Sequence, residues 1–139
     1  MKLCNDTITV FNARVDPTLG GNVYRPTTIT GVSWYMTDSS TVDSGKGGLV
    51  AANKATIRIP IDADAGDSAY TDPISYANAE DVSGLWTLKS GDIVVKAAVE
   101  GDSWTPATLK RAFADCVTVL AVTDNRRAPN APHWRITGT

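Results

Sequence analysis

Short runs of alternating apolar and polar residues recur along the chain, and most of them end at a turn sequence that contains Gly, Pro or Asp. Thr7–Val15, Ala55–Ile61 and Val117–Val122 are three such runs. A period of two is typical of a strand with one buried face, because successive side chains of a strand point to opposite sides of the sheet. This pattern constrains the chain to form sheets that bury one face.

The N-terminal part predicts a hairpin followed by a loop. Asp16-Pro17 and Gly20-Gly21 supply turn chemistry after the first strand. Ile29–Met36 is predicted to continue the second strand of this hairpin. The next stretch, Thr37–Gly48, is polar and rich in glycine. We therefore expect an exposed and mobile loop there.

The run Ala55–Ile61 alternates cleanly. The alternation predicts that Ile57, Ile59 and Ile61 face the core, while the residues between them point outward. Pro60 has no backbone N–H to donate, so this strand should run near an edge of the sheet.

Two short helices are predicted from the same pair of residue types. Asp72-Pro73 and Thr105-Pro106 each place a capping side chain before a proline at the first helical position. In the second helix, Leu109 and Phe113 recur at helical spacing and predict a buried side.

The remaining strands complete a mainly β fold. Trp86–Leu88 and Asp92–Glu100 predict one hairpin, and Cys116–Thr139 predicts a final one. The count of about seven short strands favours a small β-barrel or a barrel-like sandwich with long polar loops. At 139 residues, 42% of them hydrophobic, the chain suits a single domain over residues 1–139.

The charge of the chain is small and unevenly distributed. The formal net charge is -2, which is too near zero for a protein that binds nucleic acid over its whole surface. Residues 1–88 hold six Lys or Arg against ten Asp or Glu, whereas residues 89–139 hold seven against five. Head-to-tail association and chance both account for such an asymmetry.

The cysteines and the N-terminus point to an intracellular origin. Cys4 and Cys116 lie far apart and match no metal or disulfide pattern, so we expect two reduced, buried thiols. Asn5-Asp6 interrupts the place where a secretory signal needs an apolar run, and no run reaches membrane-spanning length. We expect a protein made and kept in a cytosol, without a membrane partner.

Catalytic and metal-binding patterns are weak in this chain. His133 is the only histidine, and no Ser or Cys sits in a nucleophile elbow, so we expect no enzyme. Asp62–Asp67 superficially resembles a calcium loop, but Pro73 stands where the bidentate glutamate belongs. Lys46 in its glycine-rich stretch lacks the following Ser or Thr of a phosphate-binding loop. We expect no catalytic site, cofactor or metal.

The turn between the last two strands concentrates polar and aromatic residues that a core does not need. Trp and Arg are enriched at interface hot spots, and loops on rigid scaffolds often have functional roles. We therefore predict a subunit or neighbour contact at this turn, with Trp134 as its anchor. The interface candidates are Asp124, Asn125, Arg126, Arg127, His133, Trp134 and Arg135.

Three pairs of segments carry a family resemblance, and they are Gly31–Tyr35 with Thr56–Pro60, Trp86–Leu88 with Gly91–Lys96, and Thr123–Arg126 with Pro132–Arg135. On these residues the chain resembles a family of small phage and prophage proteins that are encoded among the head-to-tail connector genes of long-tailed phages. The Gly-Asp-Ile-Val-Val pattern within Gly91–Lys96 is similar to a sequence in head-closure, or stopper, proteins.

The resemblance implies a β-barrel subunit that assembles in the host cytoplasm into a homo-oligomeric ring, a hexamer or a dodecamer, in the virion neck. Its neighbours would be the portal or adaptor protein on one side and the tail terminator or tail tube on the other, with packaged DNA in the channel. A tail-completion or tail-terminator-like protein and an OB-like nucleic-acid-binding barrel are the alternatives. The candidate channel loop is Ser44, Gly45, Lys46, Gly47 and Gly48.

Overall fold

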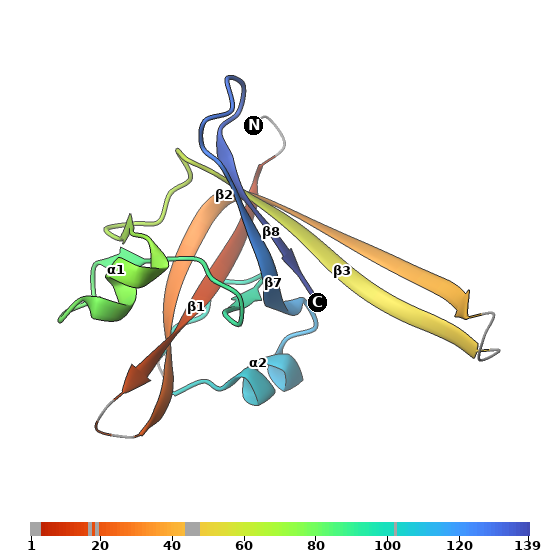
Figure 1. The fold of residues 1–139 in the computed structure, drawn as a ribbon, viewed down its shortest axis with the longest axis horizontal. Coiled ribbons are helices and arrows are strands. Elements are labelled where there is room, and N and C mark those ends of the chain that lie inside the picture. Colours follow the sequence, from red (N-terminus) through yellow and green to blue (C-terminus); the bar gives the residue numbers. More distant parts are fainter. Residues whose placement is uncertain (1–3, 17, 19, 44–47, 102) are drawn as a thin grey trace.

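The computed structural model describes residues 4–16, 18, 20–43, 48–101 and 103–139. Within these ranges the chain forms strands and two short helices (Figure 1). In chain order they are β1 (Asp6–Asp16), β2 (Gly21–Asp43), β3 (Gly48–Pro60), β4 (Ala69–Tyr70), α1 (Pro73–Asn78), β5 (Leu85–Trp86), β6 (Ile93–Val95), α2 (Pro106–Ala112), β7 (Cys116–Asn125) and β8 (His133–Gly138).

Six of the strands pair in a closed ring. Their order is β1-β2-β3-β8-β7-β6, and β6 pairs back to β1 to close the ring. All pairs around the ring are antiparallel. The prediction of a mainly β fold with a sheet that closes on itself is therefore confirmed, and so is the final hairpin of β7 and β8.

Two bulged strands form the corners of the ring. In β2 the pairing with β1 shifts at Gly31, which has a φ of 81°, and from Ser33 onward β2 pairs with β3 instead. In β7 the pairing with β8 shifts at Leu120. Bulges of this kind bend a strand and increase its twist, which lets one strand belong to two sheets.

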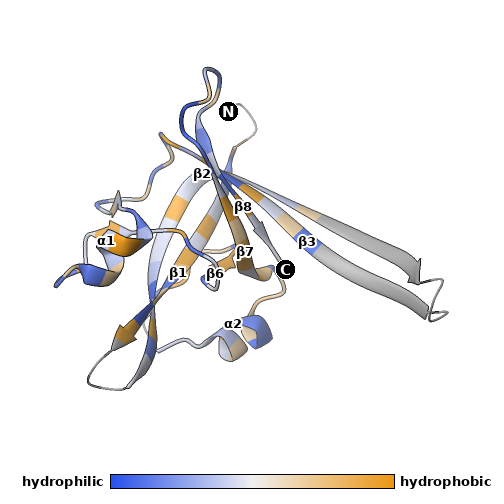
Figure 2. Ribbon diagram, viewed as in Figure 1, coloured by the Kyte–Doolittle hydropathy of each residue, from blue (hydrophilic) through white to orange (hydrophobic). Residues whose placement is uncertain are grey.

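The corners divide the ring into two sheets. The α2-side sheet contains β1, β6 and the adjoining parts of β2 and β7, and the arm-side sheet contains β3, β8 and the remaining parts of β2 and β7. Both sheets contribute to the interior, whose buried residues include Ile8, Ile57, Val117 and Ile136. The apolar stretch of β7 is visible in Figure 2.

The outer side of the α2-side sheet is also buried. Phe11, Ile93 and Val95 form a second apolar cluster with Leu109 of α2, and Leu109 is fully buried. This explains why Ile93–Val95 is an uninterrupted apolar run, since a strand covered on both faces needs no polar side.

The two predicted helices are confirmed, together with their caps. Asp72 Oδ1 accepts a hydrogen bond of 2.9 Å from the Ser75 N–H at the start of α1. Thr105 and Thr108 form a reciprocal capping box at the start of α2. Each cap satisfies backbone donors that have no partner within the helix.

The hairpin predicted for Trp86–Leu88 and Asp92–Glu100 is wrong. Leu85 and Trp86 pair in parallel with β4, while β6 pairs with β1 and β7. The physical reason is a buried polar network that holds the main chain of Thr87. Its N–H donates to Asn12 Oδ1 at 3.1 Å and its carbonyl accepts from Asn12 Nδ2 at 2.6 Å.

Asp92 completes this network inside the α2-side sheet. Its carboxylate accepts hydrogen bonds from Asn12 Nδ2 at 2.8 Å, from the Ala13 N–H at 3.0 Å and from the Lys89 N–H at 3.2 Å. The side chain is 0% exposed. Burial raises the pKa of Asp92 to about 6, and the N–H groups of Ala13 and Asn12 act in the opposite direction. The Gly-Asp-Ile-Val-Val pattern thus has a structural role here, as the tie between β1, β6 and the turn before β6.

The loop predicted for Thr37–Gly48 is mostly strand. Thr37–Asp43 belongs to β2, which pairs with β3 from Ser33↔Arg58 to Asp43↔Gly48. The polar composition favoured a loop, but the ladder with β3 supplies backbone partners that composition does not reveal.

The predicted alternation also fails at two places, the end of β3 and the bulge of β7. Ile61 is 52% exposed because β3 ends at Pro60, so the period of two no longer holds. Pro60 itself is buried rather than outward. In β7 the bulge leaves Leu120 51% exposed and turns Val122 toward the core. Strict alternation over Val117–Val122 places Ala121 on the same side as the buried Val119, but Ala121 is exposed.

Candidate functional site

The turn between β7 and β8 is organised by an ion pair. Arg126 donates to Asp124 through Nε at 3.0 Å to each carboxylate oxygen and through Nη2 at 2.7 Å to Oδ2. The Arg126 backbone N–H adds a bond of 3.0 Å to Asp124 Oδ1. The hydrogen bonds from Arg126 lower the pKa of Asp124 to about 2. The pair thus fixes the guanidinium on a surface turn in a single orientation.

The fixed guanidinium lies over an aromatic cluster. The Arg126 Cζ atom is 5.1 Å from the centroid of the Tyr70 ring and 5.3 Å from that of the Trp134 ring, within cation–π range. Trp86 meets the edges of both rings, at centroid distances of 5.2 Å to Tyr70 and 5.3 Å to Trp134. Burial raises the pKa of Tyr70, and the nearby Arg126 charge partly offsets this effect.

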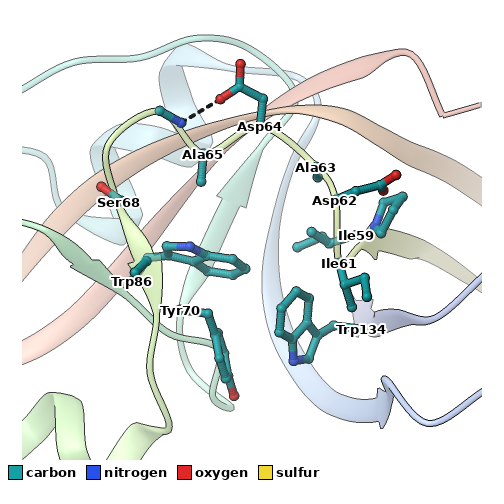
Figure 3. A pocket seen from close by; sticks show the side chains of 13 residues that line it. Ile59, Ile61, Asp62, Ala63, Asp64, Ala65, Ser68, Tyr70, Trp86 and Trp134 are labelled. Carbon is teal, nitrogen blue, oxygen red and sulfur yellow. Dashed lines mark hydrogen bonds between the residues drawn. The ribbon is translucent and has the colours of Figure 1, made fainter.

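A cavity of about 450 Å³ opens beside the aromatic cluster (Figure 3). Trp86 and Trp134 stand on its apolar side, and Asp62 and Asp64 stand at its rim. The buried Trp134 Nε1 has no hydrogen-bond partner among the described residues. Its effect on the pKa of Tyr70 is a lowering, and it is smaller than the effects of burial and of the nearby charges. The cavity therefore offers aromatic surface and acidic edges.

His133 is engaged within its own turn. Its Nδ1 lies 2.7 Å from the Ala131 carbonyl and must donate to it, because a carbonyl oxygen only accepts. Nε2 lies 3.4 Å from Asn125 Nδ2. Ala131 has a φ of 50°, so the contact belongs to a tight, left-handed position of the turn. These contacts assign the imidazole to holding the turn in shape.

The structure separates the predicted interface residues into three groups by exposure. Asp124, Arg126, Arg127 and Arg135 are exposed, and Asn125 and His133 are half-buried. Trp134, the predicted anchor, is only 6% exposed and supports Arg126 from the core. Of the predicted channel loop, Ser44, Gly45, Lys46 and Gly47 lie outside the described residues, and Gly48 begins β3.

Three other residues with structural or surface roles are only weakly indicated by local sequence patterns. Tyr70 follows a polar loop, and only the structure brings it to the aromatic cluster. Asp92 was part of a strand pattern, and nothing local indicated its burial. Alternation along its strand correctly predicts Arg58 on the outer side, but it does not reveal that Arg135 is the neighbour across the sheet.

Within the described ranges, no three His, Cys, Asp or Glu side chains gather closely enough to hold a metal ion. No helix there has the length and apolar character that a membrane crossing requires. A protein-family model described as a family of unknown function, DUF6751, matches residues 3–139. Neither a curated protein nor a solved structure matches the chain.

Proposed function

The chain belongs to the DUF6751 family of unknown function, and we propose that it is a structural subunit of a bacteriophage neck. In this proposal, copies form a hexameric or dodecameric ring between the portal or adaptor protein and the tail, as a head-closure protein does. Packaged DNA passes through the channel of the ring. The proposal assigns no catalytic step to the chain.

The observation that most supports this role is a two-stranded arm. From Thr37↔Lys54 to Asp43↔Gly48, β2 and β3 pair with each other and with no other described strand. The last pair that β3 makes with β8 is Ala55↔Gly138, so the arm begins where the ring ends. Figure 1 shows the arm extending away from the ring.

An arm of this kind favours assembly. A two-stranded hairpin by itself is marginally stable in water, and strands need a further strand or a packed face for independent stability. Both outer edges of the arm also present backbone groups that another chain can pair with. A neighbouring subunit or connector protein would supply the missing partner.

The proposal is tested by locating the chain in the particle of the phage or prophage that encodes it. A cryo-electron microscopy map of the neck should contain a ring of this fold between portal and tail. Finding the chain only in the tail tube or the baseplate would contradict the head-closure assignment.

The arm itself is tested by truncation. Joining Met36 to Ala55 through an Asn-Gly turn removes the arm at a register pair and leaves the strand pairs of the ring intact. We expect a folded protein that no longer enters particles, so that tails fail to join. A matched control joins Arg14 to Val23 in the same way and removes the end of the β1–β2 hairpin. Normal incorporation of the arm-truncated chain would remove the main support for the proposal.

A further inference from the structure

The outer face of the arm-side sheet is uncovered and basic. Two cross-strand rows make up this face, Ser33–Arg58–Arg135–Thr123 and Tyr35–Thr56–Thr137–Ala121. We call these eight positions the basic face, and they contain no Asp or Glu. Its aromatic side chain, Tyr35, is 62% exposed.

Two like charges stand directly opposite each other on this face. Arg58 of β3 is the register partner of Arg135 of β8. Like charges at directly opposite positions of a sheet destabilise it. Among the described residues, neither guanidinium has an ion-pair or hydrogen-bond partner that would offset the repulsion. Arg58 is half-buried and Arg135 is exposed, and the exposed Lys54 adds a third cation one row beyond.

The opposite charge is gathered in one continuous segment. Ile61–Leu88 connects β3 to the turn before β6 and contains six acidic residues and no Lys or Arg. We call it the acidic segment. All six carboxylates are exposed, and they are those of Asp62, Asp64, Asp67, Asp72, Glu80 and Asp81.

The basic face and the acidic segment lie on opposite sides of the same sheet. Tyr70 and Trp86 of the acidic segment pack against Trp134, which faces the interior from β8. Side chains alternate along a strand, so Arg135, the next residue of β8, points to the other side. Figure 1 shows α1, in the middle of the acidic segment, on the side of the ring away from the arm.

Other charges near these surfaces do not remove the contrast. Arg14 donates to the Ala79 carbonyl, and Arg25 lies near enough to Asp81 to act on its carboxyl group. These two cations partly balance the C-terminal end of the acidic segment. Arg126 is already paired with Asp124. The start of the segment, around Asp62 and Asp67, has no such neighbour among the described residues.

We infer that the basic face of one copy binds the acidic segment of the next copy. Opposite charges on opposite sides of a subunit favour a head-to-tail contact, and such a contact gives a ring when its rotation closes. The inference rests on the proposed function in that it supplies the contact between neighbours in the ring. It differs from the proposed function in naming the residues on each side.

Charge reversal tests the inference in the full chain. The face variant combines Arg58→Glu and Arg135→Glu, and the segment variant combines Asp62→Lys and Asp67→Lys. None of these four side chains makes a hydrogen bond or ion pair within the described residues, so both variants should fold. Each variant alone should self-associate at least about a hundredfold more weakly than the wild type in sedimentation velocity.

Mixing the two variants gives the decisive result. The reversed face of one then meets the reversed segment of the other, and the two native surfaces also match, so the mixture should recover assembly. Raising the salt from about 0.1 M to about 1 M shortens the Debye length from about 10 Å to about 3 Å and should weaken wild-type assembly. The matched control, Lys96→Glu with Arg111→Glu, changes the net charge as much as the face variant and should assemble as the wild type does.

Three outcomes would overturn the inference. They are a wild-type chain that stays monomeric up to about 1 mM, reversals that leave assembly unchanged, and a mixture that does not recover. Salt-dependent binding of duplex DNA that only the face variant loses, without self-association, would assign the basic face to nucleic acid instead. The proposed neck function has a separate test, since a chain found in the neck with charge-independent assembly contradicts only this inference.

Discussion

The two sheets of the ring differ in what covers their outer faces. The α2-side sheet is covered by an apolar cluster around Leu109, which is fully buried. The arm-side sheet presents Tyr35, Arg58 and Arg135 instead, and no described element of the chain covers them. One sheet is thus completed within the subunit, and the other has the chemistry of a surface that another molecule completes.

The largest effect on the free energy of unfolding is expected when the apolar cover of the α2-side sheet is reduced. Leu109→Ala removes the side chain that joins α2 to Phe11 and Ile93, and should lower the free energy of unfolding by about 2–5 kcal/mol. Thr137→Ala on the basic face should change it by less than about 0.5 kcal/mol. Urea denaturation of the two variants measures both values, and equal losses would contradict the contrast between the two sheets.

A pH-dependent effect is expected from Asp92, which ties β1 to the turn before β6. Its pKa is raised from 3.8 to about 6 in the folded state, so its contribution to stability is fully present below pH 3.8 and is lost as the pH rises through about 6. In the Asp92→Asn variant the side chain does not titrate, and its amide N–H₂ group faces N–H donors that it cannot accept from, so the variant should be less stable. The stability difference between wild type and variant should therefore narrow by about 2 kcal/mol between pH 4 and pH 7. A constant difference in chemical denaturation across this range would show that Asp92 does not titrate there.

A smaller effect of opposite sign is expected on the basic face. Arg58→Thr removes the like-charge contact with Arg135 and should raise the stability of the isolated subunit by about 0.2–1 kcal/mol. The same variant should weaken assembly. Thermal unfolding at a concentration where the chain is monomeric measures the first effect and sedimentation the second, with Lys96→Thr as the control. A variant that loses both stability and assembly would indicate that Arg58 serves the fold.

The smallest effect is expected from the Asp124–Arg126 pair. Both side chains are about half exposed, at 51% and 44%, so solvent screens their attraction. Asp124→Asn should cost about 0–1 kcal/mol at pH 7. The pKa of Asp124 is lowered to about 2, so its contribution is present above the ordinary value of 3.8 and is lost as the pH falls through about 2. A loss well above 1 kcal/mol would mean that the Arg126 contact with the aromatic cluster depends on the pair.

Local signals predicted the elements that depend on neighbouring residues. The cap and proline at Asp72-Pro73 specify the start of a helix wherever they occur, and β7 and β8 are joined by a turn within one segment. The arm was missed because Thr37–Asp43 becomes a strand only by pairing with Gly48–Lys54. Polar residues alone favour a loop there.

Long-range pairing explains the rest of what the sequence did not reveal. Arg58 and Arg135 are neighbours only because β3 and β8 pair in one particular register. The burial of Asp92 likewise depends on Asn12 and Ala13, from the other end of the chain. No local pattern encodes such contacts, because each is set by which strands meet and in which register.

A cryo-electron microscopy map of the assembled ring tests the central claim most directly. The account predicts that Arg58 and Arg135 of each subunit face the acidic segment of the next subunit, around Asp62 and Asp67. A ring in which the basic face lines the channel, or stays open to solvent, would contradict it.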